Sequence, residues 1–131
     1  MMKKILVIED EAQTRDILVE SLQAEGFDTI YAENGRVGVN KAQEYLPDLV
    51  ICDIIMPELD GYGVLTTLRQ NFLTAKIPLI FLTAKTSDVE RYYGMDLGAN
   101  AYVTKPCTVE SLLAAIAKVC KLSRWSNQYD L

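Results

Sequence analysis

The feature that most constrains the fold is a strict alternation of short, continuously apolar runs with longer stretches whose apolar residues recur at helical spacing. The runs lie at residues 5–8, 49–52, 77–82 and 101–103, with a weaker strand, interrupted by polar residues, at 27–32. The helical stretches lie at 11–25, 35–45, 61–69, 87–97 and 108–119. A continuously apolar strand is covered on both faces, which is typical of a parallel sheet flanked by helices. We therefore predict an α/β fold, a three-layer (βα)5 sandwich around a five-stranded parallel sheet.

The length of 131 residues suits a single domain. Because the helical periodicity ends near residue 121, we expect one domain over residues 1–121 and a C-terminal tail, or the start of a linker, over residues 122–131. No apolar run approaches the ~18 residues of a membrane helix, and the first apolar segment is too short for a signal peptide. We expect a cytoplasmic protein with no membrane partner.

Charge and residue types exclude several kinds of function. The formal net charge of −5 disfavours direct binding to nucleic acid or to an anionic membrane. Histidine is absent, which excludes a Ser–His or Cys–His catalytic pair, a histidine-ligated metal and a phosphohistidine carried on this chain. The three cysteines, Cys52, Cys107 and Cys120, form no CxxC pair, and we expect reduced, mostly buried thiols.

Polar side chains follow four of the five predicted strands. Glu9 and Asp10 come after the first apolar run, Asp53 after the third, Thr83 after the fourth and Lys105 after the fifth. In an open parallel sheet, ligands bind outside the carboxyl ends of the strands. We therefore expect these carboxylates, the hydroxyl and the amine to meet at one edge of the sheet.

Converging carboxylates repel one another and need a positive partner. A hard dication with oxygen ligands suits them, and Mg²⁺ typically takes one or two carboxylates and keeps several waters. Lys105 supplies a second positive group. A carboxylate beside a metal and a lysine is a possible phosphoryl acceptor, because phosphoryl transfer requires mainly positioning and electrostatic stabilisation. Glu11 and Thr14 can share the capping of the following helix, which leaves Asp10 to face a metal.

Together these residues resemble the receiver domain of response regulators in two-component signalling. The resemblance covers about residues 3–121 and implies a flavodoxin-like fold with strand order 2-1-3-4-5. Any one of its motifs is weak, but all of them occur in order, each at a strand end. The matching positions are the acidic pair Glu9-Asp10, the phosphoacceptor Asp53, the loop "MPELDG" after it, the pair Thr83-Ala84, the switch aromatic Tyr102 and the pair Lys105-Pro106.

The resemblance also implies a ligand set and a reaction. In the family, the metal is held by the second acid of the pair, the acceptor aspartate and the backbone carbonyl two residues beyond it. Here these are Asp10, Asp53 and Ile55, with Glu9 acting through water and Mg²⁺ as the ion. Asp53 is then expected to take a phosphoryl group from a sensor histidine kinase or a phosphotransfer protein. Such a domain catalyses its own phosphorylation and slow dephosphorylation but turns over no external substrate.

The signal is expected to leave the domain through a change in its surface. In the resemblance, Thr83 and Tyr102 form the switch: the hydroxyl moves toward the phosphate, and the aromatic ring rotates into the space beside it. The partner is then a downstream effector protein. Acids usually stand at the positions of Asn100 and Ala101, and an arginine at that of Ala115, in relatives that form symmetric dimers through this face. Their absence predicts a monomer or weak dimer.

One local prediction concerns the bond between Lys105 and Pro106, which we expect to be cis, so that the amine reaches the Asp53 pocket. A cis bond before proline costs only ~0.5–1 kcal/mol over trans.

Three alternative functions are compatible with parts of the pattern. A flavodoxin-like mononucleotide binder needs glycines and hydroxyls after the first strand, where this chain has acids that repel phosphate. A phosphohydrolase with an aspartate nucleophile needs an acid two residues after it, where this chain has Ile55. A degenerate receiver would bind partners without phosphorylation, but here the full set of site residues is present. Flavin absorbance or turnover of a chromogenic phosphomonoester would favour the first or second alternative.

Overall fold

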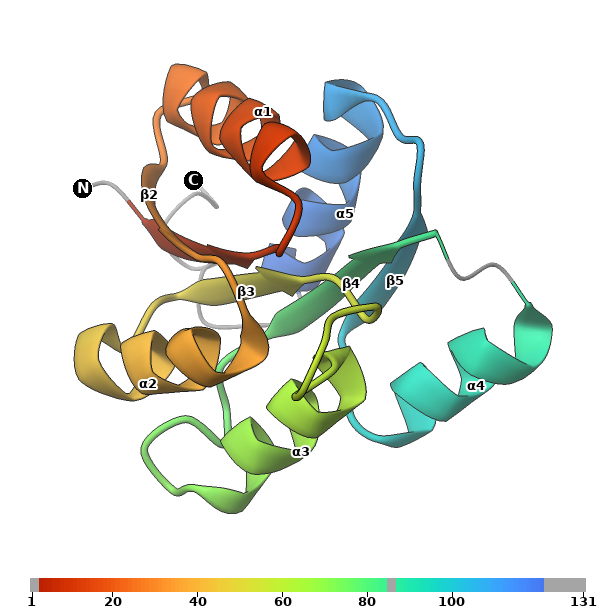
Figure 1. Ribbon diagram of the computed structural model, residues 1–131. Coiled ribbons are helices and arrows are strands. Elements are labelled where there is room, and N and C mark those ends of the chain that lie inside the picture. The colour runs from red at the N-terminus through yellow and green to blue at the C-terminus, as the bar shows by residue number, and fades with distance from the viewer. Residues whose placement is uncertain (1–2, 85–86, 122–131) are drawn as a thin grey trace.

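The computed structural model describes residues 3–84 and 87–121, with side chains to residue 119. Five strands alternate with five helices along this part of the chain, as predicted (Figure 1). In order, the elements are β1 (Lys4–Ile8), α1 (Ala12–Ala24), β2 (Asp28–Ala32), α2 (Gly35–Tyr45), β3 (Leu49–Cys52), α3 (Gly61–Gln70), β4 (Leu79–Thr83), α4 (Asp88–Asp96), β5 (Ala101–Thr104) and α5 (Val109–Lys121).

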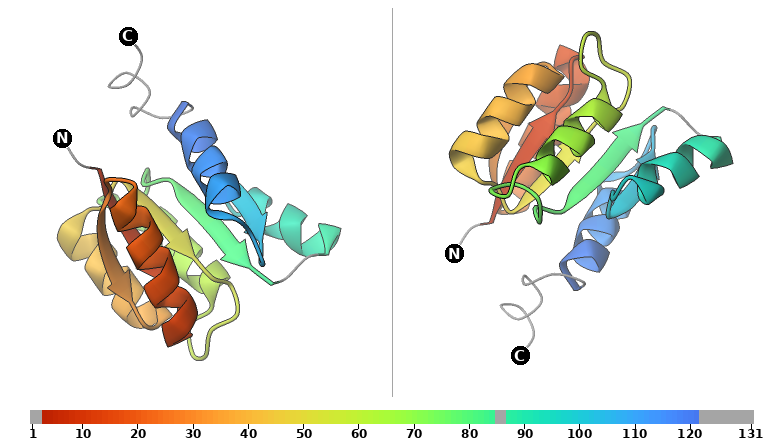
Figure 2. Two further views of the ribbon diagram at one scale, coloured as in Figure 1. Left: turned by 90° about the horizontal axis from the view of Figure 1, so that it is seen from above. Right: turned by 90° about the horizontal axis from the view of Figure 1, so that it is seen from below.

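The strands form one parallel sheet in the order β2-β1-β3-β4-β5, which confirms the predicted fold class. Helices α1 and α5 cover one face of the sheet, and α2, α3 and α4 cover the other (Figures 1 and 2). Because every strand runs in the same direction, the residues that follow the strands lie along one edge. That edge carries the polar residues singled out in the sequence.

Two apolar cores explain why the inner strands β1, β3 and β4 are almost continuously apolar. On the side of α2 and α3, alternate strand residues such as Leu6, Val50 and Phe81 pack against helix residues in one buried cluster. On the side of α1 and α5, the intervening strand residues form a second buried cluster with apolar residues of those helices. The apolar residues of β1, β3 and β4 therefore enter one core or the other, as expected for strands buried on both faces.

The element boundaries differ slightly from the predictions at two strands. The strand expected at 27–32 begins at Asp28, because the N–H of Phe27 donates to the Leu22 carbonyl and closes the turn after α1. The strand expected at 77–82 begins at Leu79 and runs on to include Thr83, so Thr83 ends β4 rather than following it. Proline has no N–H for the ladder, and Pro78 contributes only its carbonyl, which accepts from Val50 N at 2.9 Å.

Glycines end two of the helices, and the start of α1 differs from the prediction. Gly26 and Gly98 have φ values of +96° and +112°, the left-handed conformation that ends α1 and α4. Glu11 occupies the N-cap position of α1, but its side chain accepts no helix N–H and instead accepts from the Thr14 hydroxyl. The prediction that these two residues cap the helix backbone is therefore wrong for Glu11.

In the part of the chain that the structure describes, no helix combines the length and apolarity needed to span a membrane.

The described cysteines are free thiols, as expected. Cys52 is buried in β3 and Cys107 is half-buried after β5. Burial raises the pKa of the Cys52 thiol well above its usual value, and the neighbouring Asp53 raises it further. Burial also raises the pKa of Cys107. Both thiols are therefore protonated and poorly reactive near neutral pH. The Cys120 side chain and residues 122–131, for which we expected a tail or linker, lie outside the described residues.

Candidate functional site

Asp53 lies one residue beyond β3 at the carboxyl edge of the sheet and is only 7% exposed. Its Oδ1 accepts hydrogen bonds from the N–H groups of Ile54 at 2.7 Å and Ile55 at 3.3 Å. Its Oδ2 lies 3.0 Å from the Nζ of Lys105. The backbone is tied to β1, because Asp53 N donates to the Ile8 carbonyl at 3.1 Å. Protein donors thus hold both carboxylate oxygens in place.

Glu9, the other buried acid of the site, shares the same lysine. Lys105 Nζ lies 2.5 Å from Glu9 Oε1, and Glu9 Oε2 accepts from the Glu11 N–H at 3.2 Å. Burial raises the pKa of Glu9, although the hydrogen bond from Lys105 opposes this. Burial acts to lower the pKa of Lys105, but its hydrogen bonds to Glu9 and Asp53 outweigh that effect and leave the pKa raised. The lysine is therefore charged and bridges the two acids.

The three predicted acids do converge. Glu9, Asp10 and Asp53 each bring one carboxylate oxygen to within 4.8 Å of the other two. Glu9 and Asp53 are buried, whereas Asp10 lies exposed at the rim. Three carboxylates carry more negative charge than Lys105 alone offsets. An all-oxygen donor set with one solvent-exposed member, Asp10, fits a hard cation that keeps several waters, and Mg²⁺ is such an ion. Ile55 lies in the adjoining loop, and its N–H donates a hydrogen bond to Asp53 Oδ1.

Thr83 and Lys105 reach this edge from neighbouring strands. Thr83 is fully buried and pairs in register with Thr104, the residue before Lys105. Lys105 N donates to the Thr83 carbonyl at 2.8 Å, which ties the loop after β5 to the end of β4. The peptide bond between Lys105 and Pro106 is cis, so that prediction is confirmed. The structure therefore gathers the acids, Thr83 and Lys105 at one edge of the sheet.

Comparison with known families decides what kind of domain carries this arrangement. The family model for the response regulator receiver domain matches residues 5–117. The chain belongs to this family. Receiver domains are signalling switches of two-component systems, so the resemblance seen in the sequence is confirmed.

Relatives of this receiver domain include whole transcriptional regulators. It is 42% identical over 118 residues to a probable transcriptional regulatory protein of Picosynechococcus, covering 85% of this chain and 46% of that protein. It is 36% identical over 127 residues to the transcriptional regulatory protein CpxR of Escherichia coli, covering 97% and 53%. The chain thus spans about half the length of these curated relatives. Among solved structures, chemotaxis protein CheY4 of Vibrio cholerae matches with a TM-score of 0.86 at 29% identity, covering 91% of this chain and 99% of that one.

Tyr102, the expected switch aromatic of the receiver domain, lies on β5 and is 7% exposed. Its ring meets Phe81 edge-on at 6.1 Å between centroids. Arg91 of α4 covers the ring, with its guanidinium carbon 5.0 Å from the ring centroid, and Nη1 donates to the Tyr102 carbonyl at 3.1 Å. Burial raises the pKa of Tyr102 to about 12, so its hydroxyl is neutral. We expected the ring to turn inward when Thr83 moves, but here it is already inward; its role as a switch stays a prediction.

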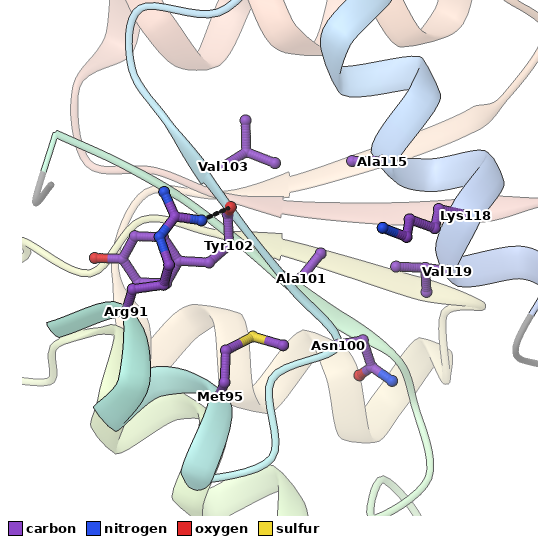
Figure 3. A pocket seen from close by; sticks show the side chains of 9 residues that line it. All are labelled: Arg91, Met95, Asn100, Ala101, Tyr102, Val103, Ala115, Lys118 and Val119. Carbon is purple, nitrogen blue, oxygen red and sulfur yellow. Dashed lines mark hydrogen bonds between the residues drawn. The ribbon is translucent and has the colours of Figure 1, made fainter. Parts of the chain in front are cut away.

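A groove of about 350 Å³ lies between α4, β5 and α5 of the receiver domain (Figure 3). Arg91 and Lys118 flank it from the two helices, and Figure 3 shows both beside an apolar floor. The floor side chains are those of Met95, Ala101, Val103, Ala115 and Val119. Asn100 also lines the groove, but its Oδ1 is engaged, accepting from Leu79 N at 2.9 Å and from Arg69 at 3.2 Å.

Two arginines at these sites escaped the sequence analysis. Arg91 covers the switch aromatic, and Arg15 of α1 donates from Nη1 to the carbonyl of Glu9 at 3.0 Å. Neither belongs to a motif that the sequence argument used. The available signal for Arg15 was its position about one and a half helical turns after the acidic pair, from which a long side chain reaches back to the strand end.

Proposed function

We propose that this receiver domain is a phosphoacceptor switch in which Asp53 takes a phosphoryl group in a Mg²⁺-dependent reaction. The observation that carries the proposal is the bridge made by Lys105, 2.5 Å from Glu9 and 3.0 Å from Asp53, beside the exposed carboxylate of Asp10. The bridge places a fixed cation against the acid that receives the phosphoryl group. Asp10, which Lys105 does not contact, remains exposed to receive an ion.

The residues divide the chemistry as follows. A carboxylate oxygen of Asp53 attacks phosphorus, a new O–P bond forms, and the bond from phosphorus to the donor breaks with its electron pair leaving on the donor. Lys105 pairs with a phosphoryl oxygen, and the Thr83 hydroxyl donates to another. Mg²⁺, when bound, neutralises negative charge on the phosphoryl oxygens. The residues that would hold it are Asp10, Asp53 and Ile55 through its carbonyl, with Glu9 acting through water.

The donor we propose is a sensor histidine kinase or a phosphotransfer protein, in which the P–N bond of a phosphohistidine is broken. The chain turns over no external substrate, and its acyl phosphate is lost slowly to water. We assign residues 1–121 to the receiver domain, residues 122–131 to a tail or the start of a linker, and the protein to the cytoplasm, in keeping with its family. The domain itself contacts neither nucleic acid nor membrane.

The output surface we propose is the groove between α4, β5 and α5. Switching at Thr83 and Tyr102 changes this surface, because Tyr102 lines the groove. Arg91 also lines the groove and lies over the Tyr102 ring, so a movement of the ring displaces Arg91 as well. The partner is a downstream effector protein rather than a second copy. Ala115 provides no charge for a symmetric salt bridge, which supports a monomer or weak dimer.

The test is intact-mass measurement after incubation with a small phosphodonor such as acetyl phosphate, with and without Mg²⁺. We expect one added phosphoryl group only with Mg²⁺, and none in Asp53→Asn. Asp60→Asn is the matched control, because Asp60 lies in the same loop and caps α3 through Gly63 N, a role that asparagine fills equally well. If Asp53→Asn still gains the phosphoryl mass, or Asp60→Asn does not, the assignment to Asp53 is wrong.

A further inference from the structure

Asp10 differs from the other two acids in how its side chain is held. Lys105 contacts the carboxylates of Glu9 and Asp53, and backbone N–H groups donate to both. Within residues 3–84 and 87–119, by contrast, no protein donor contacts the Asp10 carboxylate, which is exposed. The direction of this side chain therefore depends on its backbone, starting with the peptide group that joins it to Glu9.

One hydrogen bond holds that peptide group directly, at the Glu9 carbonyl, and a second holds the peptide group before it, at the Glu9 N–H. The Glu9 N–H donates to the Ala32 carbonyl at 3.1 Å, which continues the pairing of β1 with β2. The Glu9 carbonyl accepts from Arg15 Nη1 at 3.0 Å. A peptide group is planar, so an oxygen held in one direction also sets the direction of the following N–Cα bond. The bond from Arg15 thereby orients the Cα of Asp10, from which its carboxylate projects.

Arg15 is itself held in place by its surroundings. Its backbone N–H donates to the Glu11 carbonyl in the first turn of α1 at 2.9 Å. Its guanidinium carbon lies 5.5 Å from the centroid of the Tyr31 ring, whose other cation neighbour is Lys41 at 5.0 Å. Lys41 Nζ also donates to the Tyr31 carbonyl at 2.6 Å. The Nε of Arg15 is buried and has no hydrogen-bond partner. The guanidinium group of Arg15 therefore lacks one possible hydrogen bond, at Nε, in the position where it contacts the Tyr31 ring and donates to the Glu9 carbonyl.

We infer that Arg15 is a positioning residue for the metal-binding acids: by fixing the peptide between Glu9 and Asp10, it aims the Asp10 carboxylate at the ion. The inference rests on the proposed function, because it assigns Arg15 a task in the same Mg²⁺ site. Groups that orient metal ligands without touching the metal commonly change metal affinity 10- to 100-fold when removed. Arg15 reaches the ligand through its backbone, so we expect the lower end, about 10-fold.

The sign of the effect separates positioning from simple electrostatics. Arg15 is a cation bonded to the backbone of one of the three acids, and a cation close to the carboxylates competes with Mg²⁺ for them. If its charge were the important property, removing it would tighten Mg²⁺ binding. If its hydrogen bond to Glu9 is the important property, removing it weakens Mg²⁺ binding. The two mechanisms therefore predict opposite changes in the same measured constant.

The experiment is isothermal titration of the purified chain with MgCl₂, using Arg15→Met, Arg15→Lys and the control Lys41→Ala. Methionine keeps an unbranched apolar stem against Tyr31 but has neither charge nor donor, and lysine keeps both charge and a donor. We expect about 10-fold weaker binding for Arg15→Met, an intermediate constant for Arg15→Lys, and the wild-type constant for Lys41→Ala, which contacts Tyr31 but not Glu9. Thermal unfolding without Mg²⁺ is measured in parallel, so that each constant is read on folded protein.

Equal or tighter Mg²⁺ binding by Arg15→Met would overturn the inference. If that variant does not fold, a wild-type Mg²⁺ constant for a folded Arg15→Ala or a loss in Lys41→Ala as large as that in Arg15→Lys would overturn it equally. Failure of the proposed function looks different, because the wild-type chain would then bind no Mg²⁺ at millimolar concentration or gain no phosphoryl group on Asp53. The two failures are therefore distinguishable in one set of samples.

Discussion

Replacing Gly61 with alanine is expected to disturb both stability and the phosphoacceptor, because this residue is packed against the backbone of the site. Gly61 begins α3, and a Cβ built on it would lie 2.4 Å from the Asp53 carbonyl oxygen and 2.7 Å from the Ile54 Cα. Ordinary contacts begin at 3.4 Å, so the loop from Asp53 to Gly61 must open by about 1 Å. Gly61 N also donates to the Ile54 carbonyl at 2.9 Å, which resists that movement.

Gly63 provides a matched control two residues further along the same helix. A Cβ there would lie 2.5 Å from Leu59 Cδ1, which is the far end of a flexible side chain and can turn away. Both substitutions gain up to about 1 kcal/mol of helix propensity. Forcing a backbone apart costs about 1–3 kcal/mol. We therefore expect Gly61→Ala to lower the free energy of unfolding by up to about 2 kcal/mol, and Gly63→Ala to leave it unchanged or raise it by up to about 1 kcal/mol.

Urea unfolding followed by far-ultraviolet circular dichroism measures this difference. The same samples are tested for phosphorylation by acetyl phosphate, because the movement in Gly61→Ala displaces the backbone that holds Asp53. We expect slower phosphorylation of folded Gly61→Ala and an unchanged rate for Gly63→Ala. Equal free energies of unfolding for the two variants would refute the reasoning, since it would mean that the loop accommodates a methyl group against backbone as easily as against a side chain.

Three other predictions concern the lifetime, assembly and thiol chemistry of the domain. Ile55→Asn should shorten the lifetime of phosphorylated Asp53, because an amide can orient the attacking water and the half-exposed isoleucine offers no polar group. The decay is followed by intact-mass measurement, and an equal or longer lifetime in the variant would contradict this prediction. With beryllofluoride at tens of micromolar, light scattering should give the monomer mass, and a tight dimer through α4 and α5 would contradict the argument from Ala115. Ellman's reagent should leave Cys52 unmodified in the folded chain, tested in a variant with Cys107 and Cys120 replaced by serine; rapid labelling would show that β3 opens readily.

The fold was predictable from sequence because β1, β3 and β4 are buried on both faces and so contain unbroken apolar runs. The same property made the ends of the strands hard to predict. Phe27 and Ile77 are apolar and extend their runs, yet their N–H groups close turns with Leu22 and Thr74 instead of entering the ladder. Thr83 is polar and was placed after its strand, although it pairs with Thr104 inside the sheet. Apolar character records burial, whereas strand ends are set by backbone hydrogen bonds.

The site was predictable to the extent that strand ends share one edge. That rule brought together Glu9, Asp10, Asp53 and Lys105 without any knowledge of distances. It did not reveal that Glu9 bonds directly to Lys105, because the partners lie 96 positions apart and the choice depends on side-chain reach. Arg15 was missed for a related reason. Arg15 contacts the site at the backbone carbonyl of Glu9, and because every residue has such a carbonyl, the residue types in the sequence do not show which one Arg15 binds.

The lysine bridge constrains the order in which this site can change during divergence. Losing Lys105 first would leave Glu9 and Asp53 buried without their shared cation, and uncompensated buried charge is strongly destabilising. Replacing Glu9 by glutamine first removes one of those charges and leaves a lysine still paired with Asp53. Lineages that abandon phosphorylation are therefore expected to neutralise an acid before they lose the lysine. A receiver that keeps both acids but lacks the lysine should be rare, and should carry a new cation nearby.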